Sequence, residues 1–438
     1  MARFLKRRAT RRYGCAWMEH ENQTVFLGQR HLWGGDGPFG LPLPDRRQHT
    51  YVIGQTGTGK STLLKNLILQ DIEAGRGVAV IDPHGDLAHD IIDHIPRRRT
   101  DDVVYFDPLA PDPVALNMFR ATSDNWPLVA AGIVSVFKKI WGDSWGPRLE
   151  YVLYATVAAL LQSENTSLLG VSRMLHDERY RAWVVRQVKD PMVLSFWNNE
   201  FSRYDRGFRA EVVSPIQNKV GQLFLAPVLR NVLGQVKTKI NFRAMMDSRK
   251  IFVANVSKGL LGETHASLLG ALLVTGFELA ALSRADIPAG NRRDFFLYVD
   301  EFHLCATDSF GSMLSESRKY GLSLTIAHQY LAQLREGLKE AVFGNVGSLI
   351  SFRASESDAN VLERQFGGGY TRSQFTGLAN YEVCARLLNR EPFHGVSALP
   401  SPAVRGRRDA VCNRSREQYC TKREVVERRI QKWLDRRH

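Results

Sequence analysis

The sequence predicts an α/β fold, in which a mostly parallel sheet is covered by helices and carries an inserted all-α subdomain. Seven short runs rich in β-branched and aromatic residues, each bounded by Gly, Pro or Asp, are apolar almost throughout, which is typical of strands buried on both faces. Between the third and fourth runs, the stretch 120–240 is helical in pattern. The runs are Tyr51–Ile53, Gly77–Asp82, Asp102–Asp107, Ile251–Val256, Phe295–Asp300, Leu322–His328 and Ser348–Arg353.

The helical stretch is best marked where Leu149, Val152, Leu153, Thr156, Leu160 and Leu161 fall on one helical face. Further helical segments are expected around Leu168–Val188 and Pro191–Phe201, and Ser309–Tyr320 reads as a helix stopped by Gly321. Near the C-terminus, Thr421 and Glu424 have the spacing of a capping box and predict a basic helix that runs to about Arg436. An all-helical block between strands of one sheet indicates an inserted subdomain.

The basic charge of the chain lies at its two ends. The 438 residues have a formal net charge of +14, yet residues 1–12 hold six basic and no acidic residues, and residues 402–438 hold 12 basic against 5 acidic. Such ends favour a polyanion, either nucleic acid or an anionic membrane surface. Solubility or a disordered arm is the alternative.

Nothing in the sequence predicts an oxidising compartment or an integral membrane segment. The five cysteines form no CxxC pair and no metal-binding spacing with histidine, which favours reduced thiols and a cytoplasmic location. No run reaches the roughly 18 consecutive apolar residues of a membrane span, and Ala266–Leu282 is expected to be a buried helix. The basic N-terminus has no following apolar region, so it does not resemble a signal peptide. Peripheral association with a membrane stays open.

A phosphate-binding loop follows the first predicted strand. Residues 54–61 fit the pattern G-x-x-x-x-G-K-[ST], with a helix expected from Thr62. Glycines let successive backbone N–H groups surround phosphate oxygens, the lysine bridges β- and γ-phosphates, and the serine hydroxyl coordinates Mg²⁺. The alternative is a glycine-rich turn that only starts a helix. The candidate ATP-binding residues are Gly54, Gln55, Thr56, Gly57, Thr58, Gly59, Lys60, Ser61 and Thr62.

Two acids end the predicted strand Phe295–Val299. Asp300 is placed to hold the Mg²⁺ shell, and Glu301 to polarise an attacking water, so the pair favours ATP hydrolysis over simple nucleotide binding. The alternative is a pair of exposed acids at a strand end. Gln329 leaves the next strand and is a candidate γ-phosphate sensor or a loop residue. Arg318 is either a complement to a helix dipole or an arginine finger for a neighbouring subunit.

These motifs, taken in order, resemble the HerA/FtsK superfamily of DNA-pumping ATPases. The resemblance rests on Gly54–Ser61, on Asp82-Pro83-His84-Gly85-Asp86, on Asp300-Glu301, on Arg318–Gly321 and on Ala327-His328-Gln329, and it covers about residues 25–400. Within the superfamily the chain is most similar to soluble relatives of type IV secretion coupling proteins, the VirD4/TraG/TraD group with a TraM-recognition-type C-terminal half. Further similar pieces are Trp145–Glu150, Asn218-Lys219, Asn255–Gly259 and Gly344–Gly347.

The resemblance implies a RecA-like core of the additional-strand P-loop type, a hexamer, and ATP sites between subunits. It also implies that Arg318 is the arginine finger, with Arg353 as a second candidate whose alternative is an ion pair. Lys138 and Lys139 are offered as pore-lining residues, with a solvated helix face as the alternative. Membrane-bound coupling proteins begin with transmembrane helices, which this sequence lacks.

We therefore expect five segments and a DNA-translocating ATPase. Residues 1–50 hold the basic segment and β elements, 51–120 the first part of the core, 121–240 the helical insert, 241–400 the second part of the core, and 401–438 a basic helical tail. Nucleic acid would be held in a homo-oligomeric pore by sequence-independent contacts with phosphates. The alternatives are a coupling ATPase for protein or nucleoprotein cargo and a nucleotide-gated DNA-binding scaffold.

Overall fold

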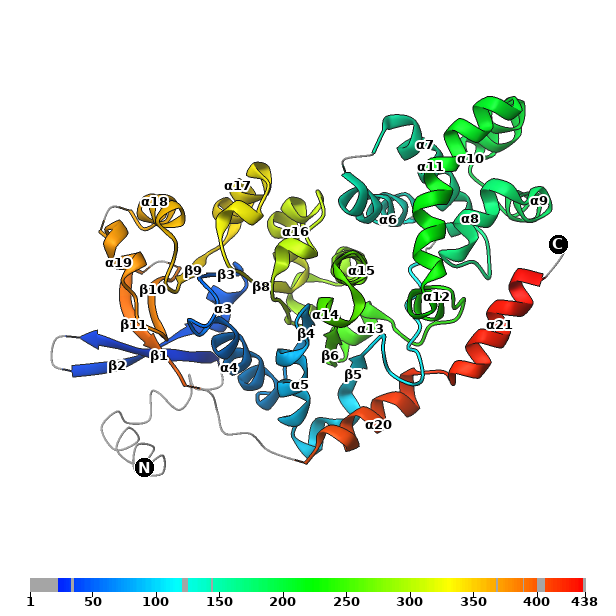
Figure 1. Ribbon diagram of the computed structural model, residues 1–438. Coiled ribbons are helices and arrows are strands. Elements are labelled where there is room, and N and C mark those ends of the chain that lie inside the picture. Colours follow the sequence, from blue (N-terminus) through cyan, green and yellow to red (C-terminus); the bar gives the residue numbers. More distant parts are fainter. Residues whose placement is uncertain are drawn as a thin grey trace.

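The computed structural model (Figure 1) describes residues 23–32, 35–119, 125–142, 145–367, 369–388, 390–399 and 406–435. The basic segment 1–22 and the predicted helix end at Arg436 lie outside these ranges.

One sheet of eleven strands runs through the described part of the chain, in the order β2-β1-β11-β10-β9-β3-β8-β7-β4-β6-β5. The strands are β1 (Thr24–Leu32), β2 (Gly35–Pro42), β3 (Thr50–Ile53), β4 (Gly77–Asp82), β5 (Val103–Phe106), β6 (Ile251–Asn255), β7 (Phe295–Val299), β8 (Leu322–His328), β9 (Ser348–Ser351), β10 (Glu382–Arg386) and β11 (Phe393–Ser397). The seven predicted strands all form, and they run parallel from β9 to β5.

The other four strands pair antiparallel beyond β9. The sequence predicts the β elements before residue 50 but not β10 or β11, which are short and carry charged residues, histidine or glycine. Strand β8 lies between β3 and β7 and pairs in parallel with both. This is the additional strand, because it separates the strand that leads to the phosphate loop from the strand that ends at Asp300.

Both faces of the parallel sheet are buried, which explains the apolar runs in the sequence. Along β4, Val78 and Val80 contribute to one core, while Ala79 and Ile81 contribute to the other. Helices α4 (Lys60–Glu73), α5 (Asp86–Asp93) and α20 (Arg408–Tyr419) cover the first face. Helices α13 (Phe242–Asp247) and α15 (Glu263–Leu282) cover the second. α15 and the following turn are apolar and long enough to span a membrane, but 78% of the most apolar stretch is buried inside the protein, as predicted.

Most of the described chain between β5 and α13 is helical, in agreement with the predicted helical insert, and most of its helices lie at the upper right of Figure 1. The predicted segment Leu168–Val188 is split at Asp177, whose carboxylate accepts the N–H groups of Arg179 and Tyr180 and so starts a second helix. The predicted face on α7 is buried along its whole length. The helices are α6 (Trp126–Trp141), α7 (Pro147–Leu161), α8 (Leu169–His176), α9 (Glu178–Val185), α10 (Pro191–Ser195), α11 (Arg206–Leu225) and α12 (Pro227–Leu233).

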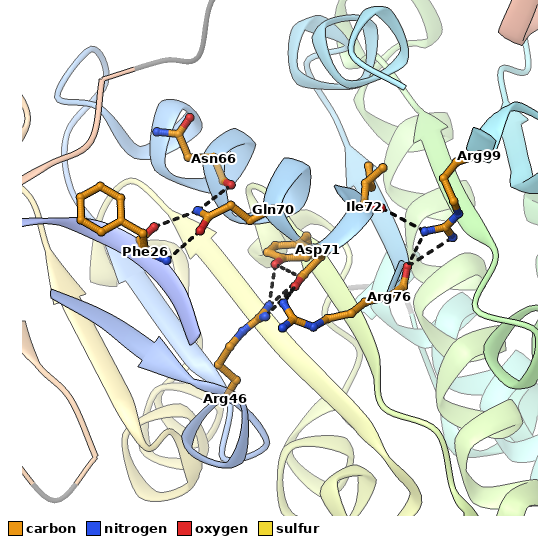
Figure 2. Close-up of polar contacts among 9 residues, drawn as sticks. Phe26, Arg46, Asn66, Gln70, Asp71, Ile72, Arg76 and Arg99 are labelled. Atoms are coloured by element: carbon orange, nitrogen blue, oxygen red, sulfur yellow. Dashed lines mark hydrogen bonds and ion pairs between the residues drawn. The ribbon is translucent and has the colours of Figure 1, made fainter. Parts of the chain in front are cut away.

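A buried ionic clamp joins helix α4 to strand β7 (Figure 2). Arg46, in the short helix α3 (Leu43–Arg46), donates to both carboxylate oxygens of Asp71 at 2.7 Å and to the hydroxyl of Tyr298 at 2.7 Å. The Tyr298 hydroxyl donates to Asp71 at 2.6 Å, and Arg76 pairs with the same carboxylate at 2.9 Å. Asp71 is on α4 and Tyr298 is on β7. The clamp therefore fixes the helix that follows the phosphate loop against the strand that leads to Asp300.

Two basic helices end the described chain (Figure 1). α20 packs against the edge strand β5, where the Ser415 hydroxyl accepts the N–H of Tyr105 at 2.8 Å. α21 (Arg423–Asp435) packs against α12 of the helical insert. It begins at Arg423, whose N–H donates to the Asp112 carboxylate at 3.2 Å, so the predicted capping box at Thr421 is wrong. A distant aspartate supplies the cap, which a local sequence pattern cannot reveal.

Candidate nucleotide-hydrolysis site

The phosphate loop joins β3 to α4 and requires glycine at its turns. Gly54, Gly57 and Gly59 have φ of 156°, 78° and 121°, a region that favours glycine. A Cβ on Gly59 would lie 2.9 Å from Cδ1 of Tyr381, so the space is closed as well. The hydroxyl of Thr58, a buried residue, donates to the carbonyl of Gln55 at 2.7 Å and ties the loop to itself. The sequence motif therefore folds as a loop that leads directly into α4, as predicted.

Lys60 starts α4 and lies close to both predicted acids. Its ammonium group donates to the carbonyls of Gly54 at 2.6 Å and Gln55 at 3.0 Å. Burial lowers the Lys60 pKa, while the charges of Asp300 and Glu301 act in the opposite direction. Ser61 and Thr62 follow in the first turn, with Ser61 exposed and Thr62 half-buried.

Asp300 and Glu301 follow β7 at the carboxyl edge of the sheet, and both are buried. The Asp300 N–H donates to the carbonyl of Ile81 at 3.2 Å, which extends the pairing of β7 with β4 by one residue. Burial, together with the nearby carboxylates of Glu301 and Asp82, raises the Asp300 pKa to about 7. Glu301 has φ 45° and ψ 47°, a left-handed conformation that a residue with a Cβ rarely adopts.

Gln329 contacts the predicted catalytic acid directly. It follows β8, and its side-chain amide donates to Oε1 of Glu301 at 2.9 Å. Burial alone would raise the Glu301 pKa, but the nearby His84 side chain and the hydrogen bond from Gln329, with the charges of His303 and Lys60, lower it. The structure thus brings together four predicted residues: Lys60, Asp300, Glu301 and Gln329.

Arg318 does not join them. It is exposed on the 3₁₀ turn η8 (Ser317–Tyr320), which follows α16 (Phe310–Glu316) and precedes β8, whereas Gln329 follows β8. The seven residues of β8 span roughly 23 Å at about 3.3 Å per residue. Arg318 lies instead near His49 at the amino edge of the sheet, where burial and, to a lesser extent, the charge of Arg318 lower the His49 pKa to about 4.

Arg353, the second candidate for the arginine finger, follows β9 and contacts the phosphate loop of its own chain. Its guanidinium donates to the side chains of Gln55 and Asn380 and to the carbonyl of Leu378, each at 3.3 Å. All three partners are neutral, and Arg353 forms no ion pair with any residue that the structure describes. The alternative prediction, that Arg353 serves in an ion pair, is therefore wrong for this part of the chain.

Comparisons with known proteins find similarity in sequence over part of the chain and in fold over most of it. Residues 38–121, which include the phosphate loop, match the family model of the helicase HerA central domain. The bacterial conjugative coupling protein TrwB superposes with a TM-score of 0.62 at 15% identity, over 86% of this chain and 91% of TrwB. The match over residues 38–121 agrees with the expected resemblance to HerA, and the superposition on TrwB shows a shared fold.

The fold is also similar to that of VirB4 of Thermoanaerobacter pseudethanolicus, with a TM-score of 0.54 at 14% identity over 86% of this chain and 97% of VirB4. TrwB has been solved in complex with ADP and Mg²⁺, in a structure that superposes with a TM-score of 0.62 at 16% identity over 87% of this chain and 91% of TrwB. A comparison with curated proteins found no match by sequence. The predicted RecA-like P-loop fold is confirmed.

Two histidines to which the sequence assigned no role lie beside Glu301, the predicted catalytic acid. His84 Nε2 lies 3.7 Å from Oε1 of Glu301, and His303 Nδ1 lies 3.5 Å from Oε2. His84 belongs to the loop after β4, which the Asp82 carboxylate shapes by accepting the N–H groups of His84 at 2.8 Å and Ala88 at 2.9 Å. The sequence held one signal for His84: residues Asp82–Asp86 follow β4, and β4 is the neighbour of β7, the strand that precedes Asp300.

The site has the charge that a divalent cation requires. Asp82, Asp300 and Glu301 are all buried, and Oε2 of Glu301 makes no hydrogen bond among the described residues. Lys60 offsets one of these charges, and the raised Asp300 pKa reflects its burial first and then the repulsion from Glu301 and Asp82. In the described ranges no group of three or more His, Cys, Asp or Glu side chains could hold a metal alone. P-loop sites complete the Mg²⁺ shell with a hydroxyl and phosphate oxygens, so Ser61 and Asp300 fit that role.

Proposed function

We propose that the chain is an ATP-dependent DNA translocase, a motor ATPase of the HerA/FtsK/VirD4 type that acts as a homo-oligomeric ring. The observation that carries the proposal is the convergence of Lys60, Asp300, Glu301 and Gln329 at one edge of the sheet. Placement of β8 between β3 and β7 produces this convergence. A protein that only binds nucleotide has no use for the buried, hydrogen-bonded Glu301.

Each residue of the site has a distinct role in the proposed hydrolysis. Lys60 and the backbone N–H groups of residues 55–60 hold the phosphates, and Ser61 and Asp300 hold Mg²⁺. Glu301 orients the attacking water, and its carboxylate is kept ionised by the partners that lower its pKa. Gln329 links Glu301 to β8, so it can register the γ-phosphate and the position of Glu301 together. Bound ATP with Mg²⁺ supplies the phosphoanhydride bond whose hydrolysis drives movement.

The position of Arg318 supports a ring. An exposed arginine at the opposite end of β8 cannot reach the nucleotide of its own subunit, but it is free to reach that of a neighbour. The ring is proposed to be a hexamer, in which Arg318 completes each site and ties hydrolysis to movement between subunits. Arg353 would act within its own subunit, because it contacts Gln55 of the phosphate loop.

DNA is the proposed cargo because basic residues cluster near both ends of the sequence. Within the described ranges, the exposed face of α21 carries Arg428, Arg429 and Lys432. Contacts of this kind bind phosphates without sequence preference and weaken as salt rises. We place the enzyme in the cytoplasm, with peripheral membrane association as an alternative.

A coupling ATPase for protein or nucleoprotein cargo is the second candidate, and the fold shared with a conjugative coupling protein favours it. The two are separated by measuring ATP turnover with single-stranded DNA, with double-stranded DNA and with candidate protein cargo. A DNA translocase is stimulated by DNA at low salt and loses the stimulation as salt rises. Stimulation by protein cargo alone would replace the first proposal with the second.

The variant Glu301→Gln tests whether hydrolysis is the function at all. We expect turnover to fall at least about 100-fold with nucleotide affinity retained, because the variant keeps the shape of the side chain and loses its charge. Glu316→Gln, at an exposed glutamate that pairs with Lys319, is the matched control and should keep full turnover. No turnover in the wild type, with nucleotide-dependent DNA binding that survives in Glu301→Gln, would favour the nucleotide-gated scaffold.

A further inference from the structure

The C-terminal end of α6, in the helical insert, contacts the loop that carries the catalytic acid. Lys139 donates from its ammonium group to the main-chain carbonyl of His303 at 3.0 Å. Burial lowers the Lys139 pKa, and the nearby charge of Arg335 lowers it further. Lys139 therefore does not project from the helix tip as a pore residue, in contrast to the sequence expectation. Its charge serves a contact inside the protein.

His303 is two residues from Glu301 in the same turn, so its position and that of the acid are linked. The N–H of Leu304 donates to the carbonyl of Glu301 at 2.9 Å, which closes the turn η7 (Phe302–Leu304). The His303 ring faces Oε2 of Glu301, and its other nitrogen lies 3.4 Å from the side-chain amide of Gln333. Because Glu301 adopts a left-handed conformation, the turn needs support from its surroundings to keep it there.

The other side of the contact is a corner between α6 and α7. The Trp145 ring N–H donates to the Glu150 carboxylate at 2.5 Å, and Lys138 lies 3.5 Å from the same carboxylate. Trp141 stacks on Phe137 one turn earlier, and Lys219 of α11 lies over the Trp141 ring at 5.6 Å. The end of α6 is therefore held by α7 and α11. The stretch Trp145–Glu150, which the sequence analysis matched to the family without a role, forms this corner.

We infer that Lys139 is a positioning residue through which the helical insert controls the catalytic loop. A movement of α7 and α11 relative to the sheet shifts the end of α6, and the Lys139 bond to the His303 carbonyl transfers that shift to Glu301. The inference rests on the proposed function, because the contact would serve to make ATP hydrolysis respond to cargo bound at the helical insert. The physical link between α6 and the Glu301 turn stands without it.

The test compares Lys139→Met, which keeps the aliphatic stem and removes the donor, with Lys139→Arg, which keeps a donor. Lys250→Met is the matched control, because Lys250 also donates to a main-chain carbonyl, that of Asp101 at 3.1 Å, at the opposite edge of the sheet. Turnover and KM for ATP are measured on the full chain with and without DNA. Hydrogen exchange is measured at the amides of residues 304–306, which close the turn.

In Lys139→Met we expect about tenfold faster exchange at residues 304–306, the equivalent of about 1.4 kcal/mol. We also expect about a tenfold lower DNA-stimulated kcat with an unchanged KM. Lys139→Arg should recover most of both losses, and Lys250→Met should resemble the wild type. If exchange and kcat are the same in Lys139→Met as in Lys250→Met, the inference is wrong. If the wild type shows no response to DNA while exchange still rises only in Lys139→Met, the link stands and the proposed DNA function fails.

Discussion

Replacing Arg46 by methionine removes the central cation of the buried clamp and tests how the two site-bearing elements are held together. Arg46 is 3% exposed and Asp71 is fully buried, so the substitution leaves the Asp71 carboxylate without its bidentate partner (Figure 2). The methionine side chain fills much of the same volume, including the space over the Phe296 ring, where the guanidinium carbon lies at 3.9 Å. The measured effect therefore reports charge more than packing.

Breaking a buried ion pair typically costs 3–5 kcal/mol. Arg76 and the Tyr298 hydroxyl still contact Asp71, so we expect the lower end, about 3 kcal/mol. The assay is urea unfolding followed by circular dichroism. Arg47→Met is the matched control, because Arg47 pairs with Asp294 at 2.9 Å but is 51% exposed, and the loss should stay below about 1 kcal/mol. If Arg46→Met and Arg47→Met lose the same free energy of unfolding, the view that the clamp stabilises the sheet is refuted.

The difference in the free energy of unfolding between the wild type and Arg46→Met should change with pH in a definite direction. In the wild type, burial acts to raise the Asp71 pKa, but the charge and hydrogen bonds of Arg46 outweigh it and lower the pKa below 3.8. The stability that the ionised Asp71 contributes is therefore fully present at neutral pH and is lost only below pH 3.8. Without Arg46, burial would raise the Asp71 pKa, and a protonated carboxyl needs no counter-charge. The gap between the wild type and Arg46→Met should therefore narrow as pH falls from 7 to 5. A gap that widens over this range would contradict the reasoning.

Three further predictions concern the site. Gly59→Ala places a Cβ against Tyr381 and should weaken binding of a fluorescent ATP analogue about tenfold or more with unchanged circular dichroism, while Gly290→Ala, where the space is open, should bind normally. Asp300→Asn should stabilise the nucleotide-free protein at pH 8 by about 2–4 kcal/mol in thermal unfolding, because a pKa near 7 makes the ionised acid costly. The wild type should gain stability as pH falls from 8 to 6, since the folded state binds a proton that the unfolded chain releases, and a flat profile would exclude this cost. Subunits with Arg318→Ala and subunits with Glu301→Gln should each lose turnover at least about 100-fold, and mixing them should restore part of it. Failure to restore turnover would remove the inter-subunit role of Arg318.

Much of this molecule could be predicted from local patterns. The parallel strands are apolar on both faces, so their runs were visible in the sequence, and the phosphate loop is defined by consecutive residues. Parallel strands of one sheet also end at one edge, which predicted that Lys60, Asp300 and Gln329 would lie together. The contact between Gln329 and Glu301 agrees with this expectation.

The remaining features depend on contacts between distant segments. β10 and β11 carry no continuous apolar run, because they pair at the antiparallel end of the sheet. Asp112 caps α21 from more than three hundred residues away, so a local capping pattern placed the helix start wrongly. Lys139 has the sequence context of an exposed helix end, and only the packing of α6 against the His303 turn shows that its charge is used internally.

The most direct test of the whole account is native mass spectrometry of Glu301→Gln in ATP and Mg²⁺. The account predicts a closed oligomer that retains unhydrolysed ATP, because Lys60, Ser61 and Asp300 still hold the nucleotide while the acid that orients water is gone. A nucleotide-free monomer under these conditions would contradict it.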